Sequence, residues 1–383
     1  SSRSGCVQYL PIYMDPTKLK FLSDAQIEQF LTDGVLVVDN VLSPEEVSRS
    51  LQGLEETLRR HGVESLSVSD ERSARAFSKL SSTNGSGGVL DLFYDDWKLE
   101  IATHPHLFAM TQDLWSAAYC QDGESQDSLS PEESFRWHPF GSFDCHKGFV
   151  YIDRVGYRLP TQQAESLGEL INPNRKRKSR ALQRSLTPHL DCCPETMYSS
   201  CSKWRPIQCF VSLSDSSQPN MGGFEAAPGF HREFDSWAKT RPPTILQRKE
   251  ADGTIRTVTM NAPCVGQYTH IRPVEDRPVM ERVRHIPVRA GSVVFWDNRI
   301  PHANAYKHLG EHPRVVIYCS FLPDIALNRD YVKHQLADFR EGKPPRDQWN
   351  HMDEDRTYPT GENGGRPFEF SSLGRRLMGM DEW

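Results

Sequence analysis

The sequence predicts a mainly β fold with flanking helices, of the double-stranded β-helix (cupin-like jelly-roll) type. A first third with helical periodicity is followed by many short apolar runs, which Gly- and Pro-rich turns separate. This order is typical of a double-sheet jelly roll supported by helices, and the strand–helix alternation of a doubly wound fold is absent. We expect a single domain over residues 1–383. It would have helical support at about 20–120, a jelly-roll core at about 148–325, and a C-terminal helix and tail at 326–383.

Two helix starts mark the N-terminal part. Ser23 and Gln26 have the spacing of a capping box, in which the side chains of the two residues bond to each other's backbone N–H groups. Ser43 and Glu46 repeat that spacing, with a proline at the first helical position. The apolar run at 35–38 between these helices predicts a buried strand.

Helical patterning returns further along the N-terminal third, at residues 90–99 and 104–119. The polar stretch 63–88 comes before these two segments, and it ends in a Ser/Gly-rich run. We expect it to be a flexible loop, because it shows no apolar periodicity.

The predicted core consists of short apolar strands. Runs at 148–160, 207–213, 286–296 and 313–321 read as strands, with a turn at Gly291. Two further helices are expected in the tail, at 330–339 and around 373–380. Residues 235–284 are mostly polar and read as an excursion between strands.

Thr187–Asp191 is the stretch that suggests chemistry. Side chains two residues apart in a strand point to the same side, so His189 and Asp191 can reach one ion together. A second histidine would complete a 2-His-1-carboxylate triad, the ligand set of non-heme Fe(II) oxygenases. His302 is the best candidate, because it follows an apolar strand at a strand-to-strand turn.

Arg314 follows His302 by twelve positions, on the next predicted strand. An arginine in an apolar barrel needs a fixed anionic partner, because burying its charge alone is very costly. The carboxylate of 2-oxoglutarate that lies away from the iron is such a partner, held by a two-pronged contact.

Together these motifs resemble the phytanoyl-CoA dioxygenase-like family of Fe(II)/2-oxoglutarate-dependent oxygenases. The resemblance rests on five segments in order: Leu22–Phe30, Asp33–Asp39, Pro188–Asp191, Gly222–His231, and the series Gly291, His302 and Arg314. It implies that His189, Asp191 and His302 bind the iron and that Arg314 binds 2-oxoglutarate. Trp204 and Asn304 resemble positions that line the co-substrate pocket.

The function expected from this resemblance is hydroxylation, desaturation or oxidative cyclisation of a small metabolite, with Fe(II), 2-oxoglutarate and O2. Six Lys and Arg residues between Arg175 and Arg184 stand just before the His189 strand. A basic rim there would attract anions, so we expect an anionic substrate. The alternative interpretation is a solvated loop without a role in binding.

Two other function classes stay open. One is an oxygenase that acts on a protein or nucleic acid, although a net charge of −6 gives no general attraction to nucleic acid, so none is expected as a partner. The other is a non-catalytic, cupin-like binding protein. No apolar run approaches the ~20 residues that span a bilayer. Nine scattered cysteines indicate reduced thiols inside a cell, and we expect a cytoplasmic location, with organelle targeting and the oligomeric state left open.

Overall fold

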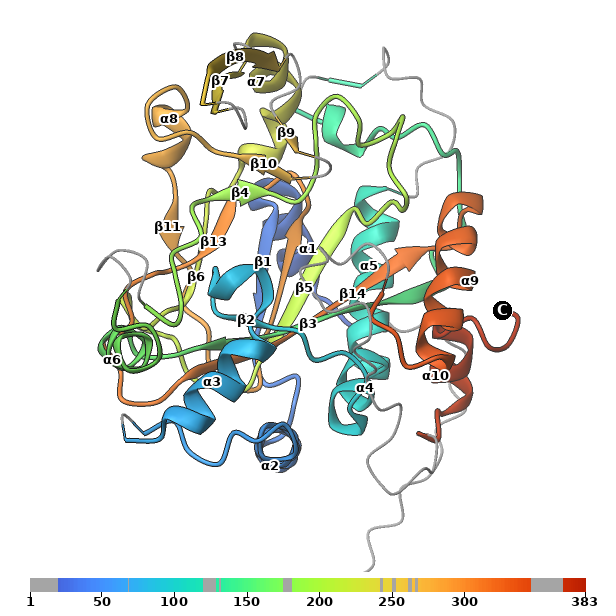
Figure 1. The fold of residues 1–383 in the computed structure, drawn as a ribbon. Coiled ribbons are helices and arrows are strands. Elements are labelled where there is room, and N and C mark those ends of the chain that lie inside the picture. The colour runs from blue at the N-terminus through green and yellow to red at the C-terminus, as the bar shows by residue number, and fades with distance from the viewer. Residues whose placement is uncertain are drawn as a thin grey trace, which may run out of the picture.

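The computed structural model describes residues 20–67, 69–119, 129–130, 132–174, 181–241, 244–249, 253–260, 264–265, 268–345 and 368–383. Two six-stranded antiparallel sheets form its centre (Figure 1). The first sheet has the order β1 (Val35–Val38), β12 (Val293–Asp297), β5 (Ile207–Ser212), β14 (Arg314–Pro323), β3 (Gly148–Arg158) and β2 (Val89–Leu90). The second has the order β11 (Arg284–His285), β6 (Phe224–Ala226), β13 (His302–Asn304), β4 (His189–Leu190), β10 (Tyr268–His270) and β9 (Cys264–Val265).

Helices lie before, between and after the strands along the chain. They include α1 (Asp24–Asp33), α2 (Pro44–Arg60), α3 (Glu71–Leu80), α4 (Asp96–Ala102), α5 (Pro105–Ala118), α6 (Thr161–Ile171), α9 (Ala326–Arg340) and α10 (Ser372–Leu377). α4 contacts β14, and α9 and α10 contact β3, so these helices cover the outer face of the first sheet (Figure 1). Shorter elements are η1 (Ser82–Gly85), η3 (Ser134–Arg136), η5 (Phe230–Arg232), α7 (Phe234–Thr240), α8 (Arg277–Met280) and the hairpin of β7 (Thr244–Lys249) and β8 (Ile255–Met260).

Each face of the first sheet packs into its own apolar core, and successive side chains of β5 point alternately into one core and the other. Cys209 and Val211 lie in the cluster under the helices, whereas Phe210 lies in the cluster between the sheets. There the Phe210 ring is 5.3 Å from Phe224 of the second sheet, and Phe224 is 5.1 Å from Trp296 of the first. The aromatic contacts therefore hold the two sheets face to face.

Several expected elements are confirmed. Both capping boxes form, at Ser23 with Gln26 and at Ser43 with Glu46. α1 ends at Gly34, whose φ of 64° is the left-handed conformation that favours glycine. The mainly β architecture with flanking helices is confirmed in the same way.

The loop expected at 63–88 is wrong, because α3 occupies its middle. Asp70 caps this helix with its side chain, and Ala74, Phe77 and Leu80 are buried along one side. These three positions, three residues apart, form a narrow apolar face in a mostly polar stretch. The burial that stabilises the helix therefore comes from the rest of the fold rather than from local pattern.

The polar excursion at 235–284 is part of the second sheet. Its strand β10 pairs with β4, placing Thr269 opposite Leu190 and His270 opposite His189. Residues 175–180 of the basic segment lie outside the described residues. None of the helices in the described part of the chain is both long and apolar enough to cross a membrane.

Candidate metal centre

Side chains from two segments that are far apart in the sequence meet in the second sheet. His189 of β4 stands opposite His302 of β13 in the strand register, and Asp191 follows β4 directly. The Nε2 atoms of His189 and His302 lie 3.6 Å and 3.5 Å from the two carboxylate oxygens of Asp191. One ligand atom from each of the three residues lies within 4.8 Å of the others, as a shared metal ion requires.

Backbone carbonyls orient both imidazole rings. Nδ1 of His189 is 3.0 Å from the carbonyl oxygen of Thr187, and Nδ1 of His302 is 2.9 Å from that of Ile300. Since a carbonyl oxygen only accepts, each Nδ1 must carry the proton. The Nε2 lone pairs are therefore left free, and both face Asp191.

The protonation states suit a metal. Burial lowers the pKa of His189 to about 4, and the nearby His302 adds to this effect. Burial alone would raise the pKa of Asp191, but the two imidazoles beside the carboxylate outweigh this effect and hold the pKa of Asp191 well below its usual value. At neutral pH the site thus offers a neutral imidazole and a carboxylate, the forms that bind divalent metals. The donor set fits Fe(II).

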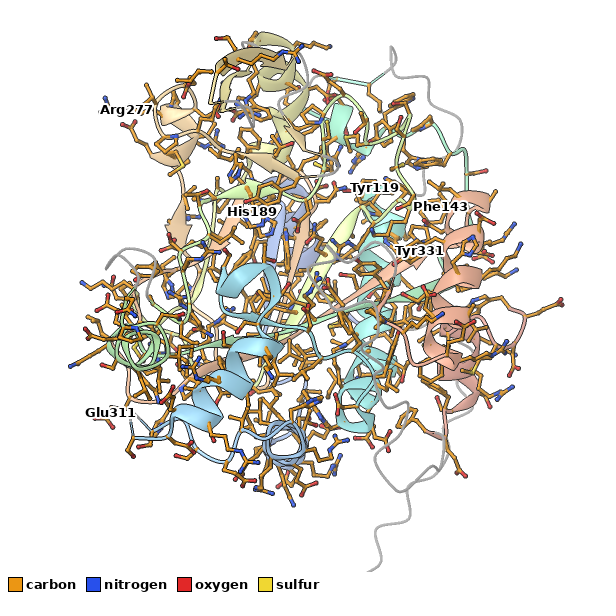
Figure 2. All side chains as sticks on the ribbon, in the orientation of Figure 1. Tyr119, Phe143, His189, Arg277, Glu311 and Tyr331 are labelled. Carbon is orange, nitrogen blue, oxygen red and sulfur yellow. The ribbon has the colours of Figure 1, made fainter. Side chains whose placement is uncertain are left out.

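Aromatic rings surround the two histidines. Tyr268 of β10 stacks on His189, which is labelled in Figure 2, with 4.8 Å between ring centres and 23° between ring planes. The Trp296 ring lies 5.1 Å from the His302 ring. Sequence reasoning missed Tyr268, because it lies in a polar segment without strand periodicity. Among the three residues only the side chain of Asp191 is partly exposed to solvent, at 33%. Solvent therefore reaches the group from the carboxylate side.

Arg314 and Asn304 lie together inside the fold. Arg314 is 2% exposed and donates from Nη1 to the side-chain oxygen of Asn304 at 2.8 Å. Asn304 in turn donates to the hydroxyl of Tyr318 at 2.7 Å and to the carbonyl of Gly87 at 3.1 Å. Nε and Nη2 of Arg314 are buried and have no hydrogen-bond partner among the described residues, which leaves two parallel donors for an anion.

Trp204 is held in place by hydrogen bonds of its backbone, and it lies in a different part of the site from Arg314 and Asn304. Its N–H donates to the side chain of Asn328 at 2.8 Å, and Asn328 donates back to the Trp204 carbonyl at 3.0 Å. The indole ring packs 4.3 Å from His138 and 5.1 Å from Phe140 between ring centres, and it borders a cavity next to Asp191. A contact of Trp204 with a co-substrate stays a prediction.

A buried charge network shapes the turn that carries His302. Arg299 donates to both carboxylate oxygens of Asp297, at 2.8 Å and 2.7 Å, and the hydroxyl of Tyr119 donates to the same carboxylate. The backbone N–H of Ile300 donates to the Asp297 carbonyl at 2.9 Å. The Ile300 carbonyl then accepts from His302, so this network fixes the orientation of a candidate ligand.

The expectation of reduced thiols is met at five of the described cysteines, Cys145, Cys192, Cys201, Cys209 and Cys319. Cys193 is disulfide-bonded, so that expectation is wrong at this position. Cys192 is free and buried, and its thiol points to the carbonyl of Asn298 at 3.4 Å. Its side chain therefore packs against the turn before β13.

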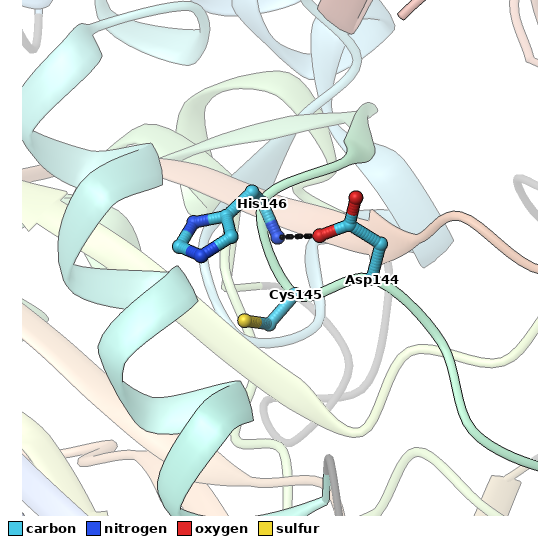
Figure 3. A group of neighbouring side chains, drawn as sticks. All are labelled: Asp144, Cys145 and His146. Atoms are coloured by element: carbon cyan, nitrogen blue, oxygen red, sulfur yellow. Dashed lines mark hydrogen bonds between the residues drawn. The ribbon is translucent and has the colours of Figure 1, made fainter. Parts of the chain in front are cut away.

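A second group of metal-type side chains consists of consecutive residues on the surface (Figure 3). Asp144 accepts from the backbone N–H of His146 at 2.9 Å, and the Lys147 ammonium lies 3.7 Å from the same carboxylate. Asp144 and His146 are exposed, and Cys145 is half-buried. The group around His189 differs in that both of its histidines are buried and oriented by carbonyls.

Comparison with known proteins points to a different family from the one expected. A model of the Gig2-like family matches residues 191–380. The expected resemblance to the phytanoyl-CoA dioxygenase-like family is therefore wrong. The segments that suggested it are short, and short segments recur among proteins of one fold that have different functions. Among curated proteins no sequence matches.

Solved structures support the fold. The chain is similar to GlcNAc Inducible Gene 2 protein, GIG2, from Candida albicans, with a TM-score of 0.62 at 17% identity over 94% of this chain and 77% of that chain. It is also similar to the hypothetical protein JW0805 from Escherichia coli, with a TM-score of 0.57 at 16% identity over 94% and 82%. The epimerase SnoN, solved with Fe3+ and alpha ketoglutarate, aligns with a TM-score of only 0.41 at 15% identity over 78% and 82%. That value is too low to support a statement about activity.

Proposed function

We propose that this protein is an Fe(II)- and 2-oxoglutarate-dependent dioxygenase, built as a single domain on a double-stranded β-helix. The observation that carries the proposal is the buried group of His189, Asp191 and His302, with both Nε2 atoms facing the carboxylate. Two histidines and one carboxylate leave positions open on Fe(II) for a bidentate co-substrate and for O2.

The residues have distinct roles in this proposal. His189, Asp191 and His302 would hold the metal, which supplies the oxidising chemistry when 2-oxoglutarate and O2 are bound, with release of succinate and CO2. Arg314 would bind the distant carboxylate of 2-oxoglutarate through Nε and Nη2, which lack protein partners among the described residues. Asn304 orients Arg314, because it accepts from Nη1.

The aromatic walls favour oxidation of a carbon–hydrogen bond away from bulk water. Tyr268, Trp296 and Phe224 flank the two histidines at ring distances of 4.8 to 5.9 Å. Such walls keep water from the reacting centre. The proposed reaction is hydroxylation, desaturation or oxidative cyclisation of a small, anionic metabolite, and no nucleic acid is expected as a partner.

The proposal is tested by removing each ligand in turn. His189→Ala, Asp191→Ala and His302→Ala should each abolish the Fe(II)-dependent conversion of 2-oxoglutarate to succinate, measured with a panel of small carboxylates and phosphates. The matched control is His146→Ala, which changes an exposed histidine of the other metal-type group. Turnover at the native rate in any ligand variant would remove that residue from the set.

The same assay separates the alternative functions. A native protein that binds Fe(II) but converts no 2-oxoglutarate with any tested metabolite, peptide or oligonucleotide would be a cupin-like binding protein. Conversion that only peptides or oligonucleotides stimulate would instead assign a macromolecular substrate.

A further inference from the structure

Two buried N–H donors without acceptors lie next to each other in the first sheet. Gln208 of β5 stands directly opposite Trp296 of β12 in the strand register. Their side chains are 3% and 2% exposed, and neither Nε2 of Gln208 nor Nε1 of Trp296 has a hydrogen-bond partner among the described residues. A buried donor without an acceptor is costly, so the pair calls for an acceptor that the described residues do not provide.

Both side chains point into the space between the two sheets. Trp296 belongs to the apolar cluster there, and so does Phe210. Gln208 precedes Phe210 by two residues in the same strand, so the two side chains share a face. Facing side chains of paired antiparallel strands have their Cβ atoms about 5 Å apart, which allows both donors to reach one ligand group. The Trp296 ring lies 5.1 Å from the His302 ring, so this pair of donors is at the metal end of the space.

The unpartnered donors of Arg314 lie toward the other end of β5. Tyr318 of β14 stands opposite Phe210, so Arg314, four residues earlier in this antiparallel strand, lies toward the last residues of β5. Gln208 lies near its first residue. The Phe210 ring is 5.1 Å from the Arg314 guanidinium carbon and 5.8 Å from the Trp296 ring. A molecule that reaches from Arg314 to the metal centre therefore runs along Phe210 and has its second end near Gln208 and Trp296.

The kinds of donor match the two ends of 2-oxoglutarate. Its carboxylate away from the metal keeps a full negative charge, which suits the paired donors of a guanidinium. Its carboxylate at the metal end shares its charge with the divalent ion, so neutral N–H donors suffice there. Gln208 and Trp296 are both neutral donors.

We propose that Gln208 and Trp296 donate hydrogen bonds to the metal-end carboxylate of 2-oxoglutarate and so select a 2-oxo acid over a plain ketone. The inference rests on the proposed function, because it takes His189, Asp191 and His302 as the metal ligands. It adds to that function a second point of recognition, at the opposite end of the co-substrate from Arg314.

The test is a titration with three ligands of equal chain length. Mn(II) replaces Fe(II), so that no turnover occurs, and the loaded protein is titrated with 2-oxoglutarate, 2-oxovalerate and levulinate (4-oxopentanoate). 2-Oxovalerate keeps the metal-end carboxylate and has a methyl group in place of the distant one. Levulinate keeps the distant carboxylate and the ketone, and has a methyl group in place of the metal-end carboxylate.

The variants remove the N–H groups and keep the size of the side chains. Trp296→Phe retains an aromatic ring, and Gln208→Met retains an unbranched chain. Each should raise the Kd of 2-oxoglutarate and of 2-oxovalerate about tenfold, as expected for a lost hydrogen bond to a charged group, and leave the Kd of levulinate close to the native value. Arg314→Lys should show the opposite pattern, with weaker binding of 2-oxoglutarate and levulinate and unchanged binding of 2-oxovalerate.

The matched control is Trp115→Phe. Trp115 is also fully buried, and its Nε1 also lacks a partner among the described residues, but its ring belongs to the core under the helices. Loss of this N–H should leave all three Kd values unchanged. If circular dichroism shows that Gln208→Met does not fold, Gln208→Glu takes its place, because it keeps the shape of the side chain and should repel the carboxylate.

The outcomes for this inference and for the proposed function differ. A native Kd for 2-oxoglutarate in both Trp296→Phe and Gln208→Met would overturn the inference. An equal loss for levulinate and 2-oxovalerate would also overturn it, because the two residues would then support the fold rather than one carboxylate. In either case the proposed function stands, since the native protein binds Mn(II) and 2-oxoglutarate. A native protein that binds neither would overturn the proposed function and this inference with it.

Discussion

Two buried arginines stand opposite each other on β3 and β14, and their partners differ. Arg158 donates from its two Nη atoms to the carbonyls of Arg184 and Tyr306, at 3.2 Å and 2.7 Å. Arg314 donates only to Asn304, and its Nε and Nη2 stay without partners among the described residues. Arg158 leaves only its Nε without a partner among the described residues, whereas Arg314 leaves Nε and Nη2, the parallel pair that a carboxylate binds, so Arg314 is the arginine that calls for an anion.

The first prediction at the residue scale concerns this difference. Arg314→Lys keeps the charge but loses the planar pair of donors, so the binding of 2-oxoglutarate should weaken by about 1.5–3 kcal/mol, the range for hydrogen bonds to charged groups. The apparent Kd for 2-oxoglutarate measures this change. Arg158→Lys is the control and should leave that Kd close to the native value. An unchanged Kd in Arg314→Lys would show that another group holds the carboxylate.

At the scale of elements, the turn between β12 and β13 depends on an ion pair. The side chains of Asp297 and Arg299 are 0% and 4% exposed, and Tyr119 donates to the same carboxylate. Burying either charge alone would cost several kcal/mol of desolvation, and the attraction between the two charges offsets most of that cost. The pair therefore links the position of α5, which ends just before Tyr119, to the turn that carries His302.

Breaking this pair should be far more destabilising than breaking a surface pair. Arg299→Met leaves the Asp297 carboxylate buried without its cation, so the free energy of unfolding should fall by about 3–5 kcal/mol. The control is Arg277→Met on α8, which removes an exposed pair with Glu281 and should cost no more than about 1 kcal/mol (Figure 2). Urea denaturation measures both changes. Similar losses in the two variants would contradict the assigned role of Arg299.

At the scale of the whole molecule, buried neutral histidines make folding sensitive to acid. Burial lowers the pKa of His231 to about 4, as it does for His189. His231 is 2% exposed, and its Nε2 lies 3.1 Å from the carbonyl of Leu31, so it ties η5 to the end of α1. At both positions the cost of burying a charge outweighs the attraction of the nearby carboxylate, so the folded state resists protonation of the imidazole.

The expected pH dependence follows from the sign of that shift. Between pH 4 and about 6.5 the unfolded chain binds more protons than the folded chain, so the free energy of unfolding rises with pH in this window. Stability is full above about pH 6.5, and the loss at pH 4 should reach roughly 3 kcal/mol for each such histidine. His231→Gln should reduce the slope in metal-free protein, measured by urea denaturation at several pH values. An equal reduction by His146→Gln, at an exposed position, would contradict this assignment.

The sequence by itself determined the local elements and the residues of the candidate centre. Capping boxes and apolar periodicity concern residues three or four apart, so helix starts such as Ser43 and strands such as β5 and β14 could be predicted from neighbours alone. Strand geometry places His189 and Asp191 on one side, and the structure brings His302 to the same point. The candidate site could be predicted to this extent because its residues lie in short, regular segments.

Only the tertiary structure decided the surroundings of that centre. Tyr268 comes from a polar segment and stacks on His189 because β10 pairs with β4. Lys203 and Arg205 lie over the ring of Tyr151, which belongs to the distant strand β3. α3 forms in a stretch that reads as a loop, because the fold buries its few apolar residues. These features depend on contacts between residues far apart in the chain, and local periodicity carries no information about such contacts.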